Sequence, residues 1–192
     1  GLNASGCAPR GFDAEALRGA GHAAVPPFSA HAVTVPGAVA GFEMLAGDYG
    51  LKGLDACLAP AIRHFGTGVP VAPRVAADWA RHSSVMQGHG ITHYLANGRA
   101  PGLGELFSSP GQAEVLRRIA AEGAPAFYTG QVAEDMVAAL REAGGAHTLD
   151  DFAAAQAEYV SPISTPYRGA EVVELPPNTH GAAALLMLCM LE

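Results

Sequence analysis

Two histidines stand at the spacing of a metal-binding pair. His89 and His93 are four positions apart, so on one turn of helix their imidazoles could bind a zinc ion together. However, Gly88 and Gly90 disfavour a helix, and no glutamate separates the histidines as the zinc-protease pattern requires. We therefore expect a loop that carries two surface histidines, and we predict no metal site.

Two other positions could supply a nucleophile. Cys7 is a candidate thiol, but no base lies near it in the sequence, and an unpaired cysteine is more often a small buried hydrophobic residue. Thr179 precedes His180, which sets a hydroxyl beside an imidazole, yet adjacent side chains rarely face each other productively. We expect Cys7 to be buried and Thr179-His180 to form a turn between a strand and a helix.

The remaining short motifs have simpler explanations. Gly102-Leu103-Gly104 resembles the start of a dinucleotide-binding loop, but no strand precedes it and the third glycine is missing. The paired carboxylates of Asp150 and Asp151 fit the first turn of a helix. Neither a nucleophile elbow nor a P-loop occurs. Taken alone, these residues assemble no active site and indicate only a globular α/β chain.

Composition limits the class of protein. The chain has 192 residues, of which 49% are hydrophobic, which is enough for one core and favours a single domain over residues 1–192. Its formal net charge is −7 with only 11 Lys and Arg, so nucleic acid and anionic membrane surfaces are excluded as partners. The three cysteines are far apart and predict neither a disulfide framework nor a structural zinc site.

Apolar spacing predicts mostly short helices. Asp13 is a plausible N-cap for the first helix, and Pro60 is expected to kink a later helix or split it in two. Thr148 begins a sequence like a capping box, with Asp151 in place of the commoner glutamate. Further helices are expected at residues 37–49, 54–65, 74–86, 110–122, 131–143, 148–156 and from 181 onward.

Strands are expected near both ends of the chain. The candidates are the end of a strand in residues 1–5, a buried strand at 31–35, and strands at 159–160 and 167–175. Residues 89–104 are expected to form a loop. The order of strand, many helices and then strands predicts an α/β (α+β) fold, with a helical layer attached to a sheet whose other strands lie outside this chain.

The ends of the chain suggest part of a longer protein. It begins GLNASG without a methionine and ends on CMLE, inside an apolar periodic segment with no helix stop signal. That segment, residues 181–191, is about half the roughly 20 residues needed to span a bilayer, so we expect a buried helix and no membrane span. We interpret residues 1–192 as an internal fragment.

A longer set of motifs resembles one enzyme family. The stretch HAVTVPGAVAGF at residues 31–42, followed by LAPAI at 58–62, is similar to the large subunit of gamma-glutamyltransferases (gamma-glutamyl transpeptidases). The similarity continues through LRRIAAEGAPAFYTG at 116–130. It then covers Gly144-Gly145, Thr148 to Asp151, Pro162-Ile163, Tyr167-Arg168-Gly169 and Leu175-Pro176-Pro177 in the family's order. The resemblance spans roughly residues 1–192.

The resemblance implies a fold and a chemistry. Members of this family are N-terminal-nucleophile hydrolases with an αββα sandwich, formed when a precursor cleaves itself into a large and a small subunit. The small subunit begins with a threonine, whose hydroxyl is the nucleophile and whose α-amine can act as the base. In the family that threonine and the oxyanion hole lie downstream of this chain. We therefore expect no catalytic residue in this chain, no metal and no organic cofactor, and the small subunit as partner.

One substrate-binding position departs from the family pattern. The family's large subunit supplies an arginine that binds the substrate α-carboxylate, three residues before an Ala-Pro pair, and the planar guanidinium suits that role. In this chain the pair is Ala8-Pro9, and the matching position holds Ser5, which carries no charge. Arg10 follows the pair and is the candidate substitute. Ser5 and Arg10 are thus the predicted substrate-binding residues, and Arg168 is expected to be structural.

Three functions follow from the resemblance. The first is an enzyme that transfers or hydrolyses gamma-glutamyl amides of the glutathione type. The second is a related acylase with another acyl specificity, and the third is a catalytically silent scaffold or interaction domain. The family resemblance implies a periplasmic or secreted location, while the residues leave a cytoplasmic one and a homo-oligomer open. Without its partner the chain should expose apolar faces and associate.

Overall fold

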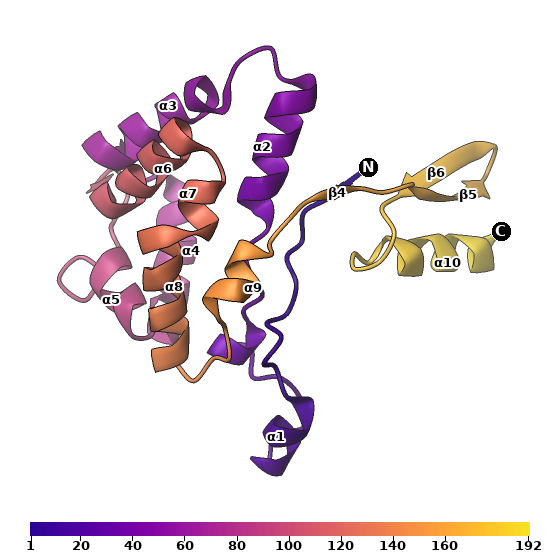
Figure 1. Cartoon of the computed structure of the whole chain (residues 1–192), viewed down its shortest axis with the longest axis horizontal. Helices are drawn as coiled ribbons and strands as arrows, with labels where there is room; N and C mark the ends of the chain where they lie inside the picture. Colours follow the sequence, from indigo (N-terminus) through magenta and orange to yellow (C-terminus); the bar gives the residue numbers. More distant parts are fainter.

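The computed structural model describes all residues 1–192 as a helical body with a small arm (Figure 1). The body holds most of the helices, and the arm carries a hairpin and the C-terminal helix. The helices are α1 Ala14–Gly19, α2 Ala38–Tyr49, α3 Leu54–Thr67, α4 Pro73–His82, α5 His89–Tyr94, α6 Pro110–Glu122, α7 Pro125–Tyr128, α8 Gly130–Glu142, α9 Leu149–Ala153 and α10 Gly181–Leu191. The strands are β1 Leu2–Asn3, β2 Val69–Pro70, β3 Leu106–Phe107, β4 Glu158–Tyr159, β5 Ile163–Tyr167 and β6 Ala170–Glu174.

The core of the body lies where α7, α8 and α9 meet the segment before α2. Phe152 and His147 are its largest fully buried side chains. Tyr128 ties two parts of the core together, because its hydroxyl donates to the carbonyl of Pro36 at 2.8 Å and accepts from the N–H of Ala40 at 3.1 Å. The buried apolar cluster consists of Val35, Ala124, Tyr128, Ala133, Val137 and Phe152.

The first residues of the chain lie beside residues far along the sequence. β1 pairs antiparallel with β4, with Leu2 opposite Tyr159, so the N-terminal segment runs alongside the connection to the arm (Figure 1). In the arm, β5 and β6 form a hairpin whose turn is Arg168-Gly169, both at positive φ. The helix α10 packs against this hairpin. All three sheets of the chain are two-stranded and antiparallel.

Most helix predictions are confirmed. The helix α6 covers residues 110–122 as predicted, and α2, α8 and α10 begin within one residue of the expected positions. Asp13 caps α1 by accepting from two backbone N–H groups. Thr148 and Asp151 form the predicted capping box at the start of α9, although α9 ends at Ala153 rather than near residue 156. These elements are specified by local signals at their own ends.

Four predictions of local structure differ from the structure in whole or in part. Residues 31–35 form no strand, because their backbone makes only one hydrogen bond to the backbone of another segment, from the N–H of Val35 to the carbonyl of Cys7. The strand predicted at 167–175 is present as β6 but begins only at residue 170, because residues 168–169 form the turn that closes the hairpin. Residues 89–94 form the short helix α5 despite their glycines. Pro60 does not split α3 in two, because the helix is continuous from Leu54 to Thr67 and packs along α6.

Two predictions of burial are also wrong. Cys7 is exposed, because it lies on an extended segment at the surface. In α10 only Gly181 and Leu185 are buried, while Met190 is 77% exposed. The hairpin covers only one side of α10, so the expected exposure of apolar faces is confirmed. No helix of the chain is long and apolar enough to cross a membrane.

Candidate substrate-binding hollow

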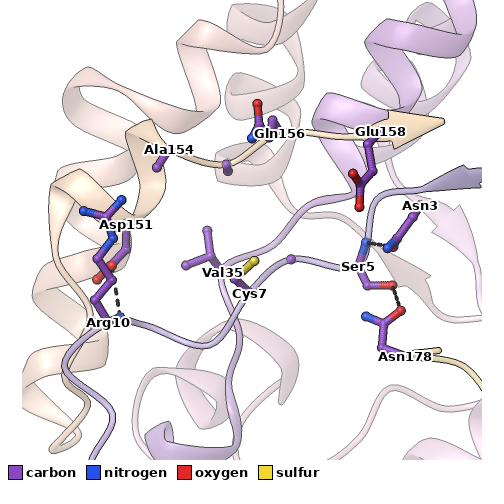
Figure 2. A pocket seen from close by; sticks show the side chains of 12 residues that line it. Asn3, Ser5, Cys7, Arg10, Val35, Asp151, Ala154, Gln156, Glu158 and Asn178 are labelled. Atoms are coloured by element: carbon purple, nitrogen blue, oxygen red, sulfur yellow. Dashed lines mark hydrogen bonds between the residues drawn. The ribbon is translucent and has the colours of Figure 1, made fainter. Parts of the chain in front are cut away.

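A hollow of about 310 Å³ lies between the N-terminal segment, the end of α9 and the loop before α10. The N-terminal segment forms its floor, and Cys7 and Val35 lie near its middle (Figure 2). Its lining consists of Asn3, Ser5, Gly6, Cys7, Arg10, Val35, Asp151, Ala154, Ala155, Gln156, Glu158 and Asn178. Both predicted substrate-binding residues are in this lining.

Ser5 lies at an end of the hollow that is rich in uncharged polar groups. Its N–H donates to Oδ1 of Asn3 at 3.2 Å, and its hydroxyl donates to Oδ1 of Asn178 at 3.3 Å. The carboxylate of Glu158 lies near Ser5 on the side away from Asn178 (Figure 2). This end of the hollow therefore offers hydroxyl, amide and carboxylate groups but no cation.

Arg10 lies at the opposite end, beside Asp151 on α9 (Figure 2). Its backbone N–H donates to Oδ1 of Asp151 at 3.1 Å, which fixes the chain direction there. The structure thus places Ser5 and Arg10 in one hollow but does not bring them together. Arg10 cannot take the place of a cation at the Ser5 end without a rearrangement of the segment between them.

Asp151 connects this hollow to the core. Its Oδ2 accepts from the N–H of Thr148 at 2.9 Å and from the Thr148 hydroxyl at 2.8 Å. Burial raises the pKa of the Asp151 carboxyl, but the hydrogen bonds from Arg10 and Thr148, with the nearby guanidinium, outweigh burial and hold that pKa below its usual value. Asp151 is therefore an anion that anchors the segment carrying Ser5 and Arg10.

The other candidate positions form no site in this chain. His89 and His93 are on α5, with ring centroids 6.4 Å apart, and Nε2 of His89 is 3.8 Å from Oε2 of Glu142 on the surface. No group of three or more His, Cys, Asp or Glu side chains is placed to hold a metal ion. The hydroxyl of Thr179 donates to the carbonyl of Leu175 at 3.3 Å, so Thr179 belongs to the predicted turn before α10.

Sequence reasoning missed most of the residues that line the hollow. Cys7 was expected to be buried, and neither Glu158 nor Asn178 was singled out. Asn178 follows the Pro176-Pro177 pair, a local signal for a loop, but nothing in the sequence indicates that this loop lies across from Ser5. Residues 5 and 178 meet only because β1 pairs with β4 and the chain then returns past the hairpin.

The whole length of the chain matches one known family. The family profile described as gamma-glutamyltranspeptidase covers residues 1–192. The chain belongs to the gamma-glutamyltranspeptidase family. Within this family it is 37% identical over 167 residues to a glutathione hydrolase-like proenzyme of Bacillus subtilis, a match that covers 84% of this chain and 31% of the relative.

Two solved structures have a similar fold over most of this chain. A cephalosporin acylase from Bacillus halodurans superimposes with a TM-score of 0.85 at 39% identity, over 92% of this chain and 35% of that one. The gamma-glutamyltranspeptidase of Helicobacter pylori superimposes with a TM-score of 0.83 at 26% identity, over 96% of this chain and 55% of that one. The predicted fold class, a helical and partial-sheet portion of the N-terminal-nucleophile hydrolase fold, is confirmed. The chain spans about a third of the length of the curated relatives it matches.

Proposed function

We propose that residues 1–192 form a single domain within the large subunit of a gamma-glutamyltransferase-like enzyme. This enzyme transfers or hydrolyses the acyl group of small amides, with gamma-glutamyl amides of the glutathione type as the first substrates to test. The observation that carries the proposal is the family match over the whole chain, whose relatives include enzymes named glutathione hydrolase proenzymes. The nucleophile is an N-terminal threonine on a small subunit of the same precursor, outside this chain.

In this proposal the chain binds and orients the substrate. The hollow lined by Ser5 and Asn178 receives the acyl group, and none of residues 1–192 attacks the amide. Ordering the acyl group against a fixed surface converts a bimolecular encounter into a positioned attack, which is a large part of enzymatic rate enhancement. The exposed apolar side of α10 and the hairpin fits a chain whose sandwich is completed by its partner subunit.

A second candidate, an acylase with a different acyl specificity, is favoured by the residue at position 5. The α-carboxylate of a gamma-glutamyl group needs a cation or several N–H donors, and an arginine is the usual partner for such a carboxylate. At the Ser5 end the nearest charge in the lining is the carboxylate of Glu158, which would repel it. The likeness to a cephalosporin acylase supports the same candidate.

One set of assays separates these candidates. The full-length protein would be given gamma-glutamyl p-nitroanilide and anilides of neutral acyl groups, and kcat/KM would be measured for each. Ser5→Arg should raise kcat/KM for the gamma-glutamyl anilide, because it adds a guanidinium at the end that has none. Ser84→Arg is the matched control, since Ser84 is exposed and lies outside the hollow.

The outcomes are distinct. Turnover of the gamma-glutamyl anilide by the unmodified protein supports the first candidate. Turnover of neutral acyl anilides, with a gain in gamma-glutamyl turnover for Ser5→Arg alone, supports the second. A protein that hydrolyses no acyl anilide and fails to cleave itself into two subunits would be a silent scaffold, and the enzyme proposal would be wrong.

A further inference from the structure

Two glycines at the start of α2 lie directly against the segment that carries Ser5. Gly37 precedes the helix and Gly41 is one turn later, and both are buried. A Cβ added at Gly41 would lie 2.6 Å from the Cβ of Ala4, and one added at Gly37 would collide with the carbonyl oxygen of Ala4 and lie 2.7 Å from the N–H nitrogen of Gly6. The segment around Ser5 therefore packs directly against the backbone at the start of α2, where Gly37 and Gly41 have no side chains.

Backbone conformation does not explain these glycines. Gly37 has φ −93° and ψ −14°, which any residue adopts, and Gly41 is inside the helix. Glycine inside a helix costs about 1 kcal/mol relative to alanine. In the same helix Gly47 has nothing within 4 Å of an added Cβ, so the contact with residues 4–6 is particular to Gly37 and Gly41.

The other side of the contact is equally close. Gly6 has φ +42°, and a side chain there would collide with the carbonyl oxygen of Val35. The N–H of Val35 donates to the carbonyl of Cys7 at 2.9 Å. Residues 4–7 are thus held against residues 35–41 on both sides of Ser5, by backbone atoms and the Cβ of Ala4 rather than by flexible side chains.

We infer that Gly37 and Gly41 are positioning residues, which fix Ser5 in the hollow by letting its segment approach the start of α2. This inference rests on the proposed function, in which the hollow binds the acyl group. The gap of 2.6 Å at Gly41 falls about 0.8 Å short of the ordinary contact distance of 3.4 Å. A methyl group there must displace the Ser5 segment by a similar amount, and misplacements near 1 Å can lower rates by roughly a hundredfold.

The test compares three alanine variants of the full-length protein. Gly41→Ala should lower kcat/KM for the preferred acyl anilide roughly tenfold to a hundredfold, mainly through KM, while the helix propensity of alanine offsets part of the loss of stability. Ala4→Gly in the same chain should restore activity, because it removes the methyl group that Gly41→Ala meets. Gly37→Ala should not be restored by Ala4→Gly, since its clash is with backbone atoms. Gly47→Ala should leave KM unchanged.

A second measurement does not depend on turnover. Amide hydrogen exchange of the peptide containing Val35 should become faster in Gly41→Ala, because displacement of residues 4–7 breaks the bond from Val35 to Cys7. Ala4→Gly should return it to the original rate. Unchanged exchange and unchanged KM in Gly41→Ala would overturn the positioning role. The protein could also turn over no anilide while exchange of the Val35 peptide still rises in Gly41→Ala and is restored by Ala4→Gly. That result would support the contact between residues 4–7 and α2 but refute the proposed function.

Discussion

Replacing Asp151 with alanine removes a carboxylate that joins α9 to the N-terminal segment. Its two oxygens accept three hydrogen bonds, from the N–H of Arg10 at 3.1 Å, the N–H of Thr148 at 2.9 Å and the hydroxyl of Thr148 at 2.8 Å. The change therefore breaks the capping box of α9 and releases the segment that forms the floor of the hollow.

The size of the effect follows from these bonds. Loss of a capping interaction costs about 0.5–2 kcal/mol, and a hydrogen bond to a charged group contributes about 1.5–3 kcal/mol. Because Arg10 is exposed, its N–H can hydrogen-bond to water once the carboxylate of Asp151 is removed, which offsets part of the loss. We expect Asp151→Ala to lower the free energy of unfolding by about 2–4 kcal/mol at pH 7. Asp150→Ala, in the same turn but exposed, should cost no more than about 1 kcal/mol.

The assay is urea unfolding of the full-length protein and both variants over a range of pH. The pKa of Asp151 is lowered in the folded protein, so its contribution is complete above its pKa in the unfolded chain, about 4. The contribution is lost as pH falls through the lower, folded value. The difference between the original protein and Asp151→Ala should thus shrink below pH 4. A difference under about 0.5 kcal/mol at pH 7, or one that grows with acid, would refute this reasoning.

Three further predictions concern other parts of the chain. Tyr128→Phe should cost about 1–2 kcal/mol in urea unfolding, because the carbonyl of Pro36 loses its donor. In NMR titrations, the carboxyl of Glu105 should titrate at a pKa of about 2, owing to its hydrogen bonds from Arg99 and a backbone N–H, and Arg99→Gln should raise that pKa toward about 4. The isolated chain, residues 1–192, should associate in light scattering, and a monodisperse, cooperatively melting monomer would contradict its exposed apolar faces.

The helices were predictable because their signals are local. Pro110 and Gly123 mark the two ends of α6, and the Thr148–Asp151 capping box begins α9, without help from distant residues. Pro60 does not split α3 because a proline removes a single hydrogen bond, which packing of α3 along α6 can offset. The predicted strand at residues 31–35 failed because a strand needs a second strand to pair with, and the backbone of this segment bonds to the backbone of another segment only at Cys7.

The candidate site was only partly predictable. Ser5 and Arg10 were predicted from the family resemblance, by their positions relative to Ala8-Pro9, and both line the hollow, but their roles in binding stay a prediction. The place of Asn178 in the hollow could not be predicted, because its hydrogen bond with Ser5 joins residues that are 173 positions apart in the sequence. The burial of α10 was mispredicted for a similar reason. An apolar helix is expected to be packed on all sides, but in this chain only the hairpin of β5 and β6 packs against it, and only on one side.

The central claim is that this chain helps to bind the acyl group of a small amide, with Ser5 at the acyl-binding end. The most direct measurement is kcat/KM of the full-length protein for gamma-glutamyl p-nitroanilide, before and after Ser5→Arg, beside the Ser84→Arg control. The account predicts acyl anilide hydrolysis by the original protein and a changed preference between gamma-glutamyl and neutral acyl anilides for Ser5→Arg alone. Identical preferences in all three proteins, or no hydrolysis of any acyl anilide, would contradict it.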